Sequence, residues 1–321
     1  MPSWARRPHV VSVPLSLGVT SVRSAGAAIG HSEEHAMVDQ EIGDFSAEVL
    51  ELGSGPVVVL VHGSASDRRT WAAQVGPLSE HFRVITYSRR YHWPNDAAAT
   101  ETNYSMTTHV EDLVGLIESV GGGPVHLIGH SYGGFIGLLT SLRHPELVQS
   151  QVLIEPPVVP LFLSDPPQAR ELLRVLATKP SLGYALVKFG TTGLVPATKA
   201  ATKNDMDKAI RIFGTAVLGK DSFNRLSPER WDQVEANNIQ AEYLSDSFGP
   251  LTEAEVRSIR APSLLVSGED SPRLWTLLTD HLHELMPESQ RVAIPSASHM
   301  AHEDNPAAFN QQLLKFIDMQ T

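Results

Sequence analysis

Short apolar segments alternate with helical patterns along most of the chain, and this alternation restricts the fold more than any other feature. After residue 45, each short run is rich in Val, Ile and Leu and is followed by Gly, Pro or polar residues. Such strands are typical of a parallel sheet that is buried on both faces and connected by helices. We therefore predict an α/β fold with a mostly parallel sheet. The expected strands are Val57–Val61, Arg83–Tyr87, Val125–Ile128, Gln151–Ile154, Ser263–Ser267 and Arg291–Ile294.

The segments between these strands repeat their apolar residues at the spacing of an amphipathic helix. The expected core helices are Trp71–Glu80, Ser105–Val120, Tyr132–Arg143, Pro272–Met286 and Pro306–Ile317. Flanking helices on both faces of the sheet follow from this order of elements.

Residues 158–250 interrupt the alternation, because they contain helical patterns and no convincing strand. The patterns are Gln168–Thr178, Asp205–Leu218 and Pro228–Asn237. A helical cap inserted between two strands is the simplest interpretation. We expect an N-terminal extension (1–36), a first part of the core (37–157), the cap (158–250) and a second part of the core (251–321).

Charge and cysteine content exclude several kinds of protein. The chain has 321 residues, a formal net charge of −11 and no cysteine. The negative charge argues against a protein built to neutralise nucleic-acid phosphates or to coat an anionic membrane. Without cysteine there is no disulfide, thiol nucleophile or Cys-ligated metal site. No apolar run reaches the ~18 residues of a membrane-spanning helix, so we expect no nucleic-acid partner and no transmembrane segment.

The first 36 residues allow two interpretations. The first 30 contain three arginines and no acidic residue, and Pro14 and Gly18 break a weakly apolar stretch. A poor targeting peptide is one interpretation. The weak hydrophobicity favours the other, a disordered extension or a natural start at Met37. A cytoplasmic location is then expected, and a secreted or organellar one if the segment is a targeting peptide.

The sequence Gly129-His130-Ser131-Tyr132-Gly133 carries the sharpest chemical signal. It lies directly between an expected strand and an expected helix. A serine on such a tight turn is exposed at the carboxyl edge of the sheet, and the glycines are needed because the turn brings backbone segments too close for side chains. We interpret Ser131 as a catalytic nucleophile.

A serine nucleophile needs a base, and a histidine-bearing segment follows the last expected strand. It reads Ile294-Pro-Ser-Ala-Ser-His299-Met-Ala-His302. From about Phe45 onward, the chain now resembles the α/β-hydrolase superfamily, in which nucleophile, acid and histidine follow in that order. The resemblance implies an α/β-hydrolase fold, favours His299 as the base and leaves His302 at the start of the following helix.

Two residues compete as the acid that orients the histidine. Glu155 ends the strand after the nucleophile helix, and this position resembles that of the acid in some haloalkane dehalogenases and in zearalenone-type lactonases. Asp270 follows the next-to-last strand, but the common Gly-Glu-x-Asp-Pro pattern places Ser271 where the aspartate belongs. We favour Glu155 and keep Asp270 as the alternative.

The resemblance also implies an oxyanion hole and a substrate pocket. His62-Gly63-Ser64 resembles the oxyanion loop of the superfamily, so the backbone N–H groups of Ser64 and Tyr132 are the expected donors. His62, Trp93 and Phe162 are candidate substrate-binding residues. We expect no metal and no cofactor.

Together these residues predict a serine hydrolase that cleaves a small hydrophobic ester or lactone. The same triad would also serve carbon–carbon bond hydrolysis or perhydrolysis. A different class is a ligand-binding, receptor-like member with a vestigial site. Oligomeric state and substrate identity do not follow from the sequence.

Overall fold

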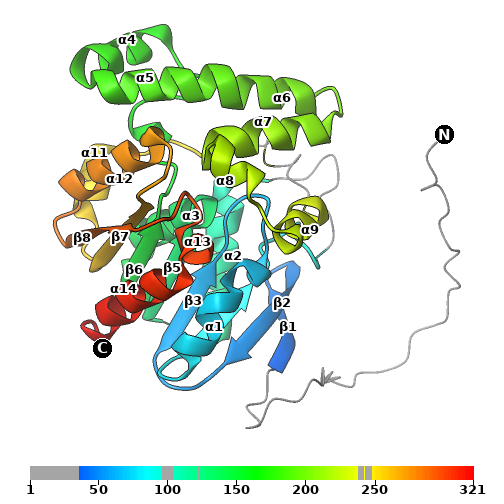
Figure 1. The fold of residues 1–321 in the computed structure, drawn as a ribbon. Helices are drawn as coiled ribbons and strands as arrows, with labels where there is room; N and C mark the ends of the chain where they lie inside the picture. Colours follow the sequence, from blue (N-terminus) through cyan, green and yellow to red (C-terminus); the bar gives the residue numbers. More distant parts are fainter. Residues whose placement is uncertain (1–35, 96–103, 122, 238–241, 243–247) are drawn as a thin grey trace, which may run out of the picture.

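The computed structural model describes residues 36–95, 104–121, 123–237, 242 and 248–321. An eight-stranded sheet forms the centre of the molecule, in the order β1-β2-β4-β3-β5-β6-β7-β8 (Figure 1). The strands are β1 (Ala36–Ile42), β2 (Phe45–Leu52), β3 (Val57–Val61), β4 (Arg83–Tyr87), β5 (Val125–His130), β6 (Val148–Ile154), β7 (Ser263–Gly268) and β8 (Ser289–Ile294). The expectation about residues 1–36 falls almost entirely outside the described residues.

The sheet is parallel from β4 to β8, as expected, and only β1 and β2 depart from this. β1 pairs with β2, and β2 with β4, in the antiparallel sense. The expected strands did not include this hairpin. Gly43 has φ 62° at its turn, and in β2 the buried residues Phe45, Ala47 and Val49 alternate with more exposed ones.

Helices cover both faces of the sheet, and the strands divide their side chains between the two layers. In β3, Val59 and Val61 belong to one core cluster, and Val58 and Leu60 to the other. The first layer contains α2 (Met106–Ser119), α3 (Tyr132–Arg143), α11 (Glu253–Ser258) and α12 (Arg273–Leu285). The second contains η1 (Arg68–Trp71), α1 (Ala72–Ser79), α13 (Ala301–Asp304) and α14 (Pro306–Asp318).

A group of helices between β6 and β7 lies over the carboxyl ends of the strands (Figure 1). It contains η3 (Val159–Leu161), α4 (Ala169–Thr178), α5 (Pro180–Phe189), η4 (Gly190–Leu194), α6 (Val195–Ala201), α7 (Met206–Leu218), α8 (Lys220–Asn224) and α9 (Pro228–Ala236). The sequence patterns anticipated α4, α7 and α9 but not α5 and α6. A short turn, η2 (Pro145–Leu147), precedes β6. No described helix has the length and apolar character needed to cross a membrane.

Candidate active site

Ser131 lies on a strained turn between β5 and α3. Its φ is 50°, a value that few residues other than glycine adopt. A Cβ atom at Gly129 would lie 2.5 Å from the carbonyl oxygen of Gly133, and one at Gly133 would lie 2.3 Å from that of Val61. Both glycines are therefore required for the turn, as the sequence predicted. The Ser131 N–H donates to the Ile154 carbonyl at 2.8 Å, which ties the turn to β6.

Glu155 and His299 form a fully buried pair beside this turn. His299 Nδ1 lies 2.6 Å from Glu155 Oε2, and the side chains are 2% and 0% exposed. The other carboxylate oxygen, Oε1, accepts the N–H of Gly268 at 3.1 Å. Glu155 follows β6 and Gly268 ends β7, so the neighbouring ends of two parallel strands hold the carboxylate in place.

The pairing determines the tautomer of His299. Because Glu155 requires a donor, a neutral His299 carries its proton on Nδ1 and leaves a lone pair on Nε2. Nε2 is buried and has no hydrogen-bond partner among the described residues. The imidazole can therefore accept a proton at Nε2 while Glu155 stabilises the resulting positive charge.

Asp270, the alternative acid, takes a different position. It is exposed, and its N–H donates to the Ala297 carbonyl at 2.9 Å. Within the described part of the chain it forms no hydrogen bond or ion pair with His299. The structure thus places Glu155, the favoured candidate, against the histidine.

Two aromatic rings pack around His299. The Trp275 ring lies 4.6 Å from its centroid and the His130 ring 4.9 Å. His130 Nε2 donates to the His299 carbonyl at 2.9 Å, so the turn that carries Ser131 also holds the backbone of the histidine loop.

His302 lies behind His130 and does not take the place of His299. Its ring centroid is 4.6 Å from that of His130, and its Nε2 lies 2.9 Å from the hydroxyl of Thr70. Burial lowers the pKa of His302 to about 3 and the pKa of His130 well below its usual value. Both rings are therefore neutral at pH 7, which avoids a second positive charge beside His299.

The expected oxyanion loop packs against the start of α3. A Cβ at Gly133 would lie 2.5 Å from the His62 carbonyl oxygen, and one at Gly63 would lie 2.8 Å from His130 Nδ1. These close approaches bring the Ser64 segment next to Tyr132, the first residue of α3. The two expected N–H donors thus come from backbone segments that touch each other.

The His62 ring holds this loop in place through backbone hydrogen bonds. Its Nε2 accepts the N–H of Arg89 at 2.9 Å, so the ring donates from Nδ1 to the Gly63 carbonyl at 2.8 Å. Burial, followed by the charge of Arg89, lowers its pKa well below the usual value. With both ring nitrogens engaged, His62 has no free nitrogen to offer a substrate.

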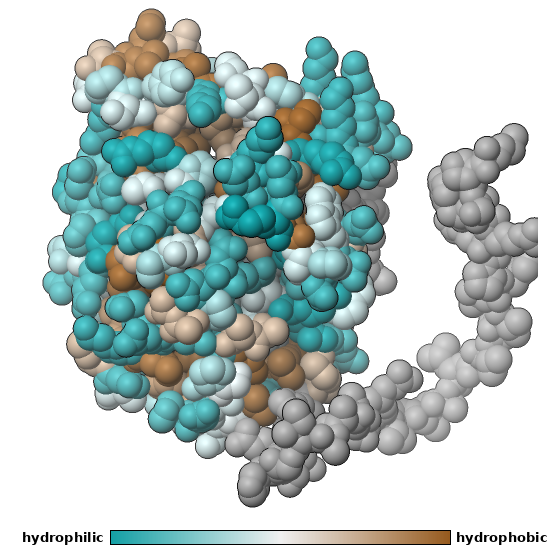
Figure 2. Space-filling view, viewed as in Figure 1, coloured by the Kyte–Doolittle hydropathy of each residue, from teal (hydrophilic) through white to brown (hydrophobic). Residues whose placement is uncertain are grey.

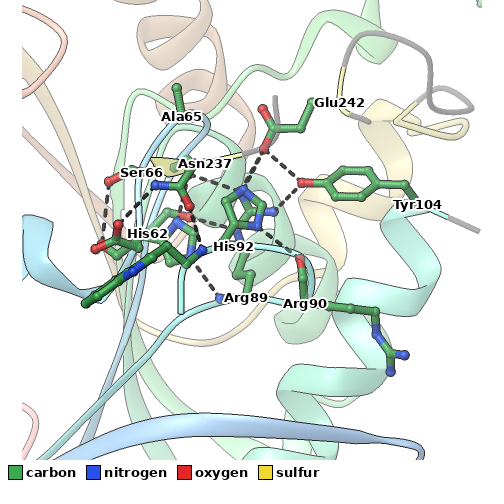
Figure 3. A network of polar contacts seen from close by, with 12 residues as sticks. His62, Ala65, Ser66, Arg89, Arg90, His92, Tyr104, Asn237 and Glu242 are labelled. Carbon is green, nitrogen blue, oxygen red and sulfur yellow. Dashed lines mark hydrogen bonds and ion pairs between the residues drawn. The ribbon is translucent and has the colours of Figure 1, made fainter. Parts of the chain in front are cut away.

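A buried arginine supports the same loop (Figure 3). Arg89 is 1% exposed and donates from Nη2 to the Gly63 carbonyl at 3.0 Å and to Glu242 at 2.9 Å. Its Nη1 donates to the Tyr104 hydroxyl at 3.1 Å, and its guanidinium lies 4.6 Å from the centre of the Tyr132 ring.

Glu242 balances the charge of Arg89. Burial opposes its ionisation, but hydrogen bonding from His92 and the charge of Arg89 outweigh burial and hold the pKa of Glu242 well below its usual value. The Ser64 side chain also bonds to this carboxylate. No motif in the sequence signals Glu242, because its role depends on contacts with residues about 150 positions away.

The other two candidate substrate-binding residues pack against neighbouring side chains. Phe162 is buried and its ring lies 4.9 Å from that of His281. Trp93 is partly exposed, and the guanidinium of Arg69 lies 3.9 Å from its ring centre. The backbone N–H of Trp93 donates to Asn237 at 2.9 Å.

No group of three His, Asp or Glu side chains within the described ranges is arranged to hold a metal ion. The polar groups described above instead pair with one another or with backbone carbonyls. The assembled parts are thus a serine on a strained turn, a histidine–carboxylate pair and a braced backbone loop.

A comparison with protein-family models matches residues 58–312 to a family described as the alpha/beta hydrolase family. A 2-(acetamidomethylene)succinate hydrolase of Mesorhizobium japonicum is 28% identical over 280 residues, which cover 87% of this chain and 94% of the relative. A putative carbamate hydrolase of Pseudomonas savastanoi is 27% identical over 271 residues, covering 83% and 95%.

Solved structures share the fold at lower identity. An esterase from Thermogutta terrifontis superimposes with a TM-score of 0.67 at 18% identity and covers 90% of this chain and 99% of its own. An esterase from Exiguobacterium antarcticum gives a TM-score of 0.66 at 21% identity, covering 85% and 96%.

Proposed function

The chain belongs to the alpha/beta hydrolase family, and on that premise we propose that it cleaves a carboxylic ester or lactone through an acyl-enzyme on Ser131. The observation that carries this proposal is the buried contact of 2.6 Å between His299 Nδ1 and Glu155 Oε2. It leaves His299 Nε2 as a lone-pair acceptor at the edge of the sheet where Ser131 lies on its strained turn.

In the proposed first step, Ser131 Oγ attacks the carbonyl carbon and His299 Nε2 takes the hydroxyl proton. Glu155 holds the imidazolium that forms through its contact with Nδ1. When the tetrahedral intermediate collapses, His299 returns the proton to the leaving oxygen and the acyl group stays on Ser131. Water, deprotonated by His299, then attacks the acyl carbon. The bond from this carbon to Ser131 Oγ breaks, His299 returns the proton to Oγ, and the acid is released.

The backbone N–H groups of Ser64 and Tyr132 are the proposed donors to the oxyanion. The peptide that carries the Ser64 N–H has the Gly63 carbonyl at its other end, and that carbonyl accepts hydrogen bonds from both His62 and Arg89. Hydrogen bonds in series polarise one another. This arrangement supports a fixed, polarised donor, and fixed donors are the kind that stabilise a developing oxyanion.

The apolar side chains of the helices between β6 and β7 favour a hydrophobic substrate. We propose residues 158–250 as the cap, between the core parts 37–157 and 251–321. Phe162, Tyr132, Trp275 and Met300 belong to one continuous apolar cluster, which suits a small, mostly apolar acyl or lactone ring. No cofactor or metal enters this mechanism.

The test is turnover on a panel of p-nitrophenyl esters and lactones of increasing chain length. We expect hydrolysis of at least one class by the wild type and none above background by Ser131→Ala, with unchanged circular dichroism. Ser141→Ala, on the buried side of α3, serves as a matched control that keeps turnover. Unchanged turnover in Ser131→Ala would exclude the acyl-enzyme, and ligand binding without turnover would favour the receptor-like alternative.

A further inference from the structure

Exposed apolar side chains concentrate on one part of the surface. Among the described residues, eight large hydrophobic side chains are exposed, and five of them lie between residues 173 and 195. They are Leu173, Leu176, Tyr184, Leu194 and Val195, and we call them the outer cap face. Leu173, Tyr184 and Val195 are 66%, 67% and 64% exposed, so the face is not the rim of a buried core.

The chain segment that carries this face, residues 166–204, has a charge opposite in sign to that of the rest of the chain. Residues 166–204 contain six of the 25 basic residues and one of the 36 acidic ones. The single acid, Glu171, accepts the N–H groups of Ser164 and Gln168 at the start of α4. A net charge of −11 for the whole protein therefore conceals a local excess of positive charge.

Each helix of this region places a cation one turn from an exposed apolar residue. Arg170 precedes Leu173 by three positions, Lys188 follows Tyr184 by four, and Lys199 follows Val195 by four. Residues three or four apart share a helix face. Lys188 and Lys199 are exposed and form no ion pair with any residue that the structure describes.

The inner faces of these helices already pack against the main core. Val175, Leu182 and Leu186 are buried in the main core cluster, so the exposed side chains are additional to it. α4 and α5 form the outermost layer of the molecule in Figure 1, and brown, hydrophobic atoms gather over them at the top of Figure 2. The face thus points away from the sheet.

We propose that the outer cap face docks on the surface of an anionic lipid bilayer. Exposed apolar side chains with lysine and arginine on adjacent turns are typical of helices that lie in the membrane interface. The apolar side chains would enter the boundary between headgroups and acyl chains, while the cations contact lipid phosphates. A second copy of this face is a poorer partner, because two positive surfaces repel each other.

The experiment is co-sedimentation of the full-length protein with vesicles of phosphatidylcholine alone or mixed with phosphatidylglycerol. We expect binding to the mixed vesicles, little binding to phosphatidylcholine alone, and release when the salt is raised from about 0.1 M to 1 M, which shortens the screening length. Equal binding to both vesicle types would overturn the electrostatic part of the proposal.

Two pairs of variants separate the contributions. Lys188→Ala/Lys199→Ala should weaken partitioning roughly 25-fold, because each cation near an anionic surface contributes roughly a fivefold factor. Leu173→Ser/Tyr184→Ser should weaken it without changing the salt dependence. The control, Lys315→Ala/Met319→Ser, alters a similarly exposed cation and apolar side chain on and just after α14 and should bind like the wild type.

Thermal unfolding of each variant distinguishes lost docking from lost folding. No binding by the folded wild type, or equal weakening by the control pair, would overturn the proposal. So would concentration-dependent self-association that Tyr184→Ser abolishes, since the face would then be covered by a second copy. None of these outcomes depends on whether Ser131 is the nucleophile.

Discussion

The guanidinium of Arg89 donates to the carbonyl oxygen of Gly63 at 3.0 Å, and so a fully buried cation holds the peptide group whose N–H belongs to Ser64. The same nitrogen donates to Glu242 at 2.9 Å. The proposed oxyanion loop is therefore stabilised by an ion pair between a loop after β4 and the segment that follows α9.

Breaking this pair should destabilise the protein strongly. Arg89→Met leaves the Glu242 carboxylate buried without its cation, and such changes cost about 3–5 kcal/mol in the free energy of unfolding. The double variant Arg89→Met/Glu242→Gln should recover part of that loss. Urea unfolding at pH 7 gives both values, with Arg257→Met, from an exposed pair with Glu253, as a control that costs under about 1 kcal/mol. A loss for Arg89→Met no larger than the control would contradict the assignment.

Arg89 should also affect catalysis through the loop it holds. Arg89→Lys keeps the charge but lacks the planar fork that reaches Gly63 and Glu242 together. We expect kcat to fall by up to about 10²–10³, the cost of one oxyanion donor, with little change in KM. Steady-state kinetics on an ester substrate measures both. A rise in KM with kcat preserved would show that Arg89 serves substrate binding instead.

The identity of the orienting acid gives a third prediction. Glu155→Gln removes the charge that stabilises the His299 imidazolium and can reverse the tautomer, so we expect kcat to fall by about 10⁴. Asp270→Asn changes an exposed carboxylate and should leave kcat within about twofold. If the Asp270 variant lost far more activity than the Glu155 variant, the acid would be Asp270.

Buried neutral histidines make the folded state sensitive to acid. The pKa of His302 is about 3 in the folded protein and about 6.5 in an unfolded chain. The unfolded state therefore binds more protons between these values, and the free energy of unfolding falls as the pH drops below about 6.5.

This single group contributes up to about 1.4 kcal/mol per pH unit to that slope. His302→Gln, which retains a partner for Thr70, should show a correspondingly shallower decline between pH 6.5 and pH 4. Urea unfolding at several pH values measures the slope. Parallel curves for the variant and the wild type would show that His302 does not contribute to it.

The sequence anticipated those parts of the fold whose signals are local. β3 and β4 occupy the predicted residues, because buried parallel strands appear as short runs of β-branched residues between turns. The glycines around Ser131 were equally informative, since the close approaches at Gly129 and Gly133 leave room for no side chain.

Features that depend on tertiary contacts were not visible in the sequence. β1 and β2 lie at the edge of the sheet and carry acidic residues on exposed positions, such as Asp39 and Glu41, so they lack the signal of a buried strand. Similarly, α5 continues through Gly190 and Gly193 into α6, and glycine and proline there conceal a helix that packing on α7 stabilises.

In the candidate site, too, the residues with local sequence signals were predicted and those that depend on tertiary contacts were not. Glu155 was favoured over Asp270 because its position resembles that of the acid in some relatives and because Ser271 takes the place of the usual aspartate, and the structure places Glu155 beside His299. Arg89 and Arg90 follow β4, and their pattern in the sequence does not reveal their partners. The structure pairs Arg89 with Glu242 and Arg90 with Asp112 and Asp44. Partners so distant along the chain leave no periodic signal.

The most direct test of the central claim is labelling with a fluorophosphonate probe, followed by peptide mass spectrometry. An activated serine attacks phosphorus and displaces fluoride, so the label reports the nucleophile without knowledge of the substrate. We expect a single labelled residue, Ser131, and labelling that is slower by about 10⁴ in Glu155→Gln, the loss expected when the charge of a triad acid is removed. Labelling at another serine, or none on folded protein, would contradict it.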